Sequence, residues 1–163
     1  VHQYIARVMQ EVSNIITQHN GIIDKYMGDS VMAFWDSQSC LHHAQKAVNA
    51  AIAIELYFNK DYAGGAKASE PLEYGIGINS GVAMVGQMGT TERASYTVMG
   101  DVINVASRLQ TLSGTMGCHI ILGSETAEQL EGIPYRSLGE VKLRGRQNTV
   151  LIHTPTIPIV SLS

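Results

Sequence analysis

Cysteine is scarce in this sequence, since only Cys40 and Cys118 occur, far apart and outside any CxxC pair. This spacing does not indicate a disulfide framework, and it predicts two free thiols in a reducing cytoplasm. The short run Cys40–His43 contains two adjacent histidines, but neighbouring residues at a helix start point about 100° apart. We therefore reject it as a metal site.

Long apolar runs and an excess of one charge are also missing. No run reaches the length of a membrane span and no secretory signal peptide opens the sequence, so we expect no direct membrane contact from this segment. The net charge is −3 at pH 7 and the basic residues are dispersed, which argues against nucleic-acid binding. The 163 residues, 45% of them hydrophobic, are typical of one globular domain with a substantial core.

The segment Gly21–Trp35 predicts a β-hairpin. Two apolar runs, residues 22–27 and 30–35, flank the pair Gly28-Asp29. Glycine at the first central position suits a type II′ turn, which places the Asp29 carboxylate at the tip. Aspartate also favours turns without any function, and for this residue alone both interpretations stay open.

Lys25 lies within the first predicted strand of this hairpin. Alternation of side chains places Ile23, Lys25 and Met27 on one face, and Ile22, Asp24 and Tyr26 on the other. A cation in a mostly apolar strand suggests a function, although a lysine can also protect an exposed strand edge.

Helical spacing of apolar residues begins at Val1 and continues to Ile16, with Asn20-Gly21 as the predicted stop. The apolar stripe is at full strength at Val1 without a capping residue, which suggests a helix entered partway. A second helix is predicted for Cys40–Tyr57, capped by Ser39, followed by a loop over residues 61–71.

Two strands are predicted within Glu73–Met88, around the turn Asn79–Gly81. Gly75 and Gly77 leave one strand face nearly bare, so we expect another part of the chain to approach it closely. Residues 89–95 are predicted as a polar loop and residues 96–99 as a strand.

Asp101 is the predicted cap of a third helix. Asn104 and Arg108 are four residues apart and share one stripe of this helix, opposite its apolar face. A solvated helix face is the simpler interpretation of two such residues.

The C-terminal part predicts a strand over residues 119–122, a short helix over 124–130 and a strand pair, residues 135–143 and 150–154. Lys142, Arg144 and Arg146 alternate at one end of this pair, next to Gly145. They form either a solvated edge or a place for phosphates. The tail, residues 155–163, is expected to be extended.

Three stretches together resemble the catalytic domain of class III nucleotidyl cyclases: NGIIDKYMGDSVMAFW, GIGINSGVAMVGQMGTTERASYTVMGDVINVASRLQ and LGEVKLRGRQNTV. Their order and spacing fit that family from Val1 to about Thr154. The resemblance implies an α/β (α+β) domain over residues 1–154 with a ferredoxin-like βαββαβ palm. It also implies an adenylate cyclase, in which the 3′-hydroxyl of ATP attacks the α-phosphorus with the help of two Mg²⁺ or Mn²⁺ ions.

The resemblance also assigns roles to individual residues. Asp29 matches a metal-binding carboxylate of the family, Lys25 the lysine that reads the adenine N1 atom, and Thr97 the second base-reading position. Thr at that position is typical of a subclass that often responds to bicarbonate. Asn104 and Arg108 match the pair that orients the ribose and stabilises the reacting phosphate. Arg146 matches a cation on the outer phosphates, with Arg144 a weaker candidate.

In this family the active site lies between two head-to-tail protomers, which implies a homodimer, normally joined to regulatory domains in a longer cytoplasmic signalling protein. The family's first strand carries a second metal aspartate and precedes the helix that begins here at Val1. We therefore expect an N-terminally truncated domain that is inactive alone. Two alternatives are a guanylate cyclase, disfavoured because Lys25 can only donate, and a cyclase-like regulatory module that binds nucleotide without turnover.

Overall fold

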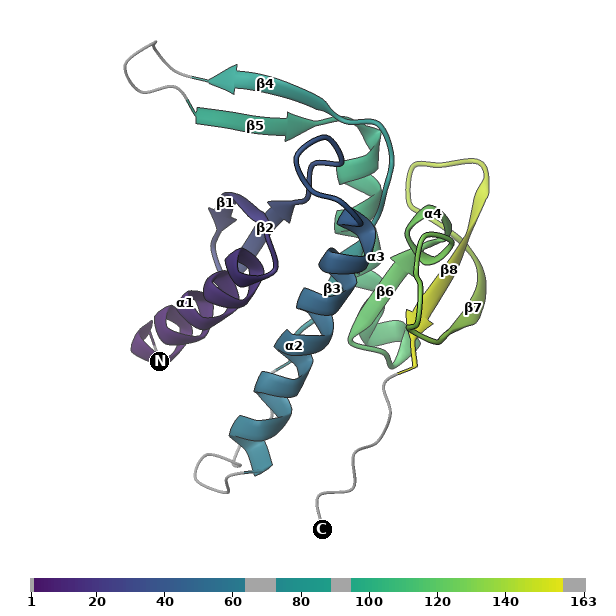
Figure 1. The fold of residues 1–163 in the computed structure, drawn as a ribbon. Coiled ribbons are helices and arrows are strands. Elements are labelled where there is room, and N and C mark those ends of the chain that lie inside the picture. The colour runs from purple at the N-terminus through teal and green to yellow at the C-terminus, as the bar shows by residue number, and fades with distance from the viewer. Residues whose placement is uncertain (1, 64–72, 89–94, 157–163) are drawn as a thin grey trace.

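The structure, a computed structural model, describes residues 2–63, 73–88 and 95–156. It is an α+β fold, which confirms the predicted class (Figure 1). The elements, in chain order, are α1 (His2–Gln18), β1 (Ile22–Met27), β2 (Ser30–Phe34), α2 (His43–Ala63), β3 (Ile76–Ile78), β4 (Met84–Met88), β5 (Ser95–Met99), α3 (Asp101–Met116), β6 (Ile120–Gly123), α4 (Ser124–Ala127), β7 (Tyr135–Lys142) and β8 (Thr149–Pro155). From α1 to β3 this order follows the predicted βαββαβ palm from its first helix onward.

A four-stranded mixed sheet in the order β3-β6-β8-β7 is the largest sheet among the described residues, with β3 and β6 parallel and the other pairs antiparallel. All four residues of β6 are buried. Because side chains alternate along a strand, Ile121 packs with Leu109 of α3, whereas Ile120 and Leu122 pack with Val48 of α2. Helices thus cover both faces of this strand.

The β1–β2 hairpin forms a separate two-stranded sheet. Its turn has a φ of +60° at Gly28, while Asp29 keeps a negative φ, so the type II′ turn is confirmed. The strict alternation predicted for β1 is wrong, because a bulge occurs at Asp24: Ile23 pairs with Ala33 and Lys25 pairs with Met32. Ile23 and Lys25 therefore lie on opposite faces, Ile23 against the core and Lys25 in solvent.

Helix ends follow the predictions only in part. Asn20 adopts a left-handed conformation after α1, and the Gly21 amide bonds the Ile16 carbonyl at 2.9 Å, which confirms the predicted stop. Helix α2 begins at His43 and extends to Ala63. Ser39 does not cap it, since the Ser39 amide instead bonds the Asp36 carbonyl in a preceding turn.

The other predicted boundaries are similarly mixed. Asp101 is the first residue of α3 and does not cap it; the capping position is Gly100. Helix α4 ends at Ala127, earlier than predicted. Of the predicted loops, residues 61–63 belong to α2, while residues 64–71 and 89–94, together with residues 157–163 of the tail, lie outside the described part of the chain.

Helix α3 provides the close approach that the bare glycine face of β3 predicts. A Cβ atom at Gly75 would overlap the Ser113 side chain, and one at Gly77 would overlap the backbone of Ala106 and Gln110. The absence of side chains at these two positions therefore sets the distance between the sheet and the helix that carries Asn104 and Arg108.

Gly77→Ala is expected to lower the free energy of unfolding by about 3 kcal/mol, because the methyl group would press on a helix backbone that cannot move aside. Urea denaturation measures the change. Gly114→Ala is the control, because Gly114 lies on α3 itself and has open space around its Cβ position. This substitution should raise the free energy of unfolding by about 0.5–1 kcal/mol. Equal stability of the two variants would contradict this packing.

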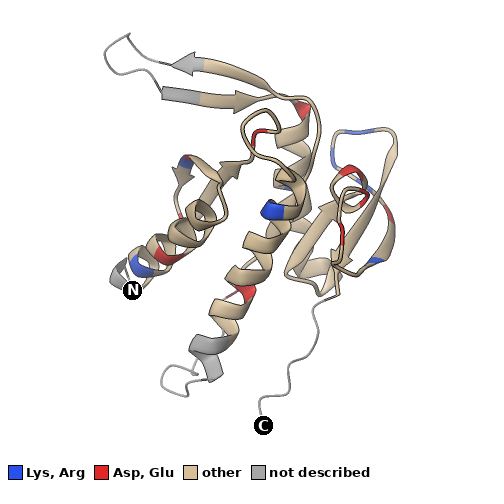
Figure 2. Ribbon diagram, in the orientation of Figure 1, with Lys and Arg blue, Asp and Glu red and all other residues tan. Residues whose placement is uncertain are grey.

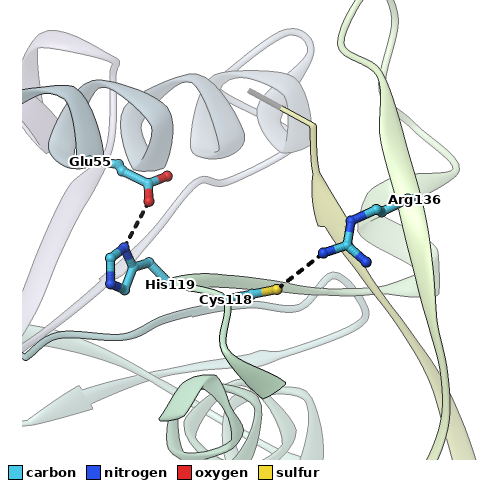
Figure 3. Close-up of polar contacts among 4 residues, drawn as sticks. All are labelled: Glu55, Cys118, His119 and Arg136. Carbon is cyan, nitrogen blue, oxygen red and sulfur yellow. Dashed lines mark hydrogen bonds and ion pairs between the residues drawn. The ribbon is translucent and has the colours of Figure 1, made fainter. Parts of the chain in front are cut away.

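Polar contacts connect the residues directly before β6 to α2 and to β7 (Figure 3). His119, directly before β6, places Nδ1 2.8 Å from Glu55 Oε1 of α2. On the other side, the Arg136 guanidinium of β7 donates to Cys118 Sγ over 3.6 Å. Cys40 and Cys118 are both free thiols, as predicted.

Strands β4 and β5 form an arm that extends away from the four-stranded sheet (Figure 1). Apolar side chains are exposed on it and next to it: Val82, Met84, Val85 and Met99. Within the described ranges, no helix has the length and apolar character needed to cross a membrane.

Candidate active site

One group of predicted site residues meets at the N-terminal part of α3. An open pocket of about 420 Å³ lies between this helix and the loop that joins β7 to β8, and it is lined by Asp101, Asn104, Arg108, Gly145, Arg146, Gln147 and Asn148. Asn104 and Arg108 reach it from successive turns of the helix, as their shared stripe predicts. The structure thus brings three predicted residues together: Asn104, Arg108 and Arg146.

Gly145 lets the loop approach Arg108 closely. Its φ is +82°, a conformation that favours glycine, and a Cβ atom there would lie 3.5 Å from Arg108 Nη2. The Arg108 guanidinium therefore lies against the loop backbone, and its side chain is half-buried.

Arg146 forms an ion pair with Asp101, across the pocket. The sequence pattern assigned Asp101 to capping, so its place in the pocket was missed, and so were those of Gln147 and Asn148. The two amides follow directly after the basic segment, which was the available signal for them. Two guanidinium groups against one carboxylate leave the pocket positive, and guanidinium groups suit phosphate oxygens.

Arg144 lies outside this pocket, although the same loop carries it. It is exposed and is not among the residues that line the cavity. Figure 2 shows the positive charge of this region along the β7–β8 loop. The three alternating cations do not share one site. Arg146 is directed toward α3 and pairs with Asp101, unlike Lys142 and Arg144.

The second group of predicted residues lies where β1 contacts β5. Thr97 is buried, and its hydroxyl donates to Asp24 Oδ2 over 3.1 Å. The Lys25 ammonium lies 3.8 Å from the same oxygen, with the lysine side chain 46% exposed and the aspartate side chain 1% exposed. An ammonium group and a hydroxyl from two different strands are thereby held around one carboxylate.

Asp24 was missed as a site residue. The pattern of the strand placed it on the face opposite Lys25, whereas the bulge at Asp24 brings its carboxylate next to the Lys25 ammonium. Its second oxygen, Oδ1, is buried and has no hydrogen-bond partner among the described residues. A carboxylate adjacent to a candidate base-reading lysine was the available signal.

Asp29 is exposed at the hairpin tip and does not line the α3 pocket. Figure 1 shows the β1–β2 turn and the β7–β8 loop on opposite sides of α3. A carboxylate is a suitable ligand for Mg²⁺ or Mn²⁺. However, the described parts of the chain contain no group of three His, Cys, Asp or Glu residues that could hold an ion. The residues present therefore supply one ligand and do not by themselves fit a two-metal site.

Comparison with known proteins gives a consistent result. The family described as adenylate and guanylate cyclase catalytic domain matches residues 1–154. The chain is 34% identical over 145 residues to adenylate cyclase 1 of Rhizobium meliloti (strain 1021), covering 86% of the chain and 22% of that protein. It is 32% identical over 145 residues to an adenylate cyclase of Anabaena cylindrica, covering 85% of the chain and 28% of that protein. The chain thus spans about a quarter of these relatives.

Solved structures show the same fold. The adenylyl cyclase CyaB from P. aeruginosa superposes with a TM-score of 0.79 at 28% identity, covering 99% of this chain and 85% of that one. The guanylyl cyclase Cya2 superposes with a TM-score of 0.75 at 26% identity, covering 95% and 81%. Both nucleotide specificities are therefore represented among the similar structures.

Proposed function

The chain belongs to the adenylate and guanylate cyclase catalytic domain family, and we propose that it acts as an adenylate cyclase, converting ATP to 3′,5′-cyclic AMP and pyrophosphate. The observation that carries this choice of nucleotide is the placement of Lys25 and Thr97 around one carboxylate. An ammonium group only donates, which suits the adenine N1 acceptor and opposes the N–H of guanine. The Thr97 hydroxyl can accept from the adenine amino group.

In this proposal the α3 pocket binds the rest of the nucleotide. Asn104 orients the ribose, and the Arg108 guanidinium stabilises the negative charge that develops on the α-phosphate during attack by the 3′-hydroxyl. Arg146 contacts the outer phosphates, for which its ion pair with Asp101 must open. Asp29 would contribute one carboxylate to divalent ions, Mg²⁺ or Mn²⁺, which supply Lewis-acid chemistry to the family's reaction.

We further propose that the site forms between two chains in a head-to-tail homodimer. The β1–β2 turn, which carries Asp29, and the β7–β8 loop, which lines the Arg108 pocket, lie on opposite sides of α3 (Figure 1), so a partner could complete each of two sites. The exposed apolar residues of the β4–β5 arm offer a surface for association. The domain would serve as the cytoplasmic output module of a longer signalling protein.

The test is product formation by the full-length protein from ATP or GTP, with Mg²⁺ or Mn²⁺, followed by chromatography and mass spectrometry. We expect cyclic AMP as the main product, with kcat/KM for ATP exceeding that for GTP by about 100-fold, since two base contacts change sign between the nucleotides. Preferred formation of cyclic GMP would establish the guanylate cyclase alternative. Nucleotide binding without either product would establish the regulatory module.

A further inference from the structure

Asp24 is buried in a way that folding alone does not explain. Its side chain is 1% exposed, and it receives one hydrogen bond, from Thr97, together with the more distant Lys25 ammonium. Its Oδ1 atom is buried without a partner among the described residues. A buried carboxylate with an unsatisfied oxygen is costly, and apolar replacements of such groups are often neutral or stabilising. The residue therefore stands out as one kept for a purpose other than stability.

The contact between Asp24 and Thr97 fixes the direction of the Thr97 hydroxyl. A hydroxyl carries one hydrogen and two lone pairs, so a free threonine can either donate to a ligand or accept from it. Here the single hydrogen is committed to Asp24 Oδ2. Only lone pairs of Thr97 Oγ1 then remain for a third group, and the side chain presents itself to a base as an acceptor.

We propose that Asp24 is a positioning residue that determines base selectivity by holding Thr97 as an acceptor; this rests on the proposed adenylate cyclase function. A base with an amino group, as in adenine, can donate to Thr97. A base with a carbonyl at that place, as in guanine, would direct lone pairs at lone pairs, because Thr97 no longer has a hydrogen to give. Asp24 itself contacts the lysine and the threonine and not the nucleotide.

A different role for Asp24 must be separated from this one, since its carboxylate could act only as a counter-ion for Lys25. The two roles differ in their dependence on Thr97. Fixing the hydroxyl requires that a hydroxyl is present, whereas holding the ammonium does not. A double-mutant cycle with Thr97 therefore isolates the proposed role.

The experiment measures Kd for ATP and GTP on the full-length protein, by displacement of a fluorescent nucleotide, together with kcat/KM for each. Asp24→Ala should reduce the ATP-over-GTP preference about tenfold, the effect of one hydrogen-bond mismatch. Asp24→Asn should keep it within about threefold, because the amide oxygen can still accept from Thr97. In a Thr97→Val background, Asp24→Ala should change the preference less than about twofold.

Two further variants complete the experiment. Asp24→Leu removes the acceptor while filling the space, and replaces Asp24→Ala if thermal unfolding shows that the alanine variant is not folded. Asp36→Ala is the matched control, since Asp36 is exposed and bonds only the Gln38 amide among the described side-chain contacts, and it should leave the preference unchanged.

The outcomes are distinguishable. Preserved selectivity in Asp24→Ala and Asp24→Leu, in a protein that prefers ATP, overturns the role of Asp24 and leaves the proposed function intact. An equal loss of the ATP-over-GTP preference with Thr97 and with Thr97→Val shows that Asp24 acts as a counter-ion for Lys25. This result also overturns the proposed role of Asp24. No preference for ATP in the unmodified protein overturns the proposed choice of nucleotide, and the role of Asp24 with it.

Discussion

Mixing the Asp29→Asn and Arg108→Ala variants is expected to restore about a quarter of the unmodified activity, although each variant alone should be about 100-fold or more below it. Under the proposed roles, Asp29→Asn would weaken metal binding, and Arg108→Ala would remove charge stabilisation at the reacting phosphate. In a head-to-tail dimer, a mixed pair concentrates both substitutions in one site and leaves the other site native. Random exchange gives about half mixed dimers, each with one working site of two.

The measurement is cyclic AMP production after co-expression of the two full-length variants with different affinity tags, which also quantify mixed dimers. The matched control combines Asp29→Asn with the double variant Asp29→Asn/Arg108→Ala. That pair forms mixed dimers without any native site and should stay inactive. Absence of recovery in the first mixture, with mixed dimers present, would place Asp29 and Arg108 in a site within one chain and refute the shared site.

Combining Lys25→Glu with Thr97→Cys is expected to shift the GTP-over-ATP ratio of kcat/KM upward by about 100-fold or more, because both base contacts are inverted. The introduced glutamate would accept where the lysine donates, and a thiol can donate where the held hydroxyl accepts. The structure adds one requirement. The new carboxylate would lie next to Asp24, and Asp24 would also take the thiol hydrogen as it takes that of Thr97. Asp24→Leu should therefore accompany the pair, because it removes both the like charge and the competing acceptor.

Rates of cyclic AMP and cyclic GMP formation, separated by chromatography, give this ratio in the full-length protein. Lys142→Gln is the control of equal net charge change, since it and the triple substitution each remove one positive charge net. Lys142 is exposed on β7 and lies outside both groups of site residues. A ratio unchanged by the triple substitution, in a variant that still binds nucleotide, would show that Lys25 does not read the base.

Local patterns in the sequence were enough to place the hairpin and the helix stripe. Gly28-Asp29 between two apolar runs predicts the turn and the position of Asp29, since the constraint lies within two residues. Asn104 and Arg108 likewise follow from the 3.6-residue period of one helix. The bare face at Gly75 and Gly77 correctly predicted a close neighbour, although it did not identify α3.

The contacts that complete the candidate site depend on residues distant in the sequence. The bulge at Asp24 accompanies a hydrogen bond to Thr97 on another strand, which no pattern within β1 contains. The Asp101–Arg146 ion pair depends on the path of the β7–β8 loop past α3. The start of α2 was misplaced because Ser39 fits a capping pattern but lies in a turn that ends before His43.

Under the proposed arrangement, the separation of the β1–β2 turn from the α3 pocket also sets how output depends on the amount of protein. A lone chain holds no complete site, so in dilute conditions complete sites increase with the square of chain concentration. Doubling the number of chains then raises synthesis about fourfold. A flanking segment that tethers two chains would raise their effective concentration and so the output, without contacting any residue of the site.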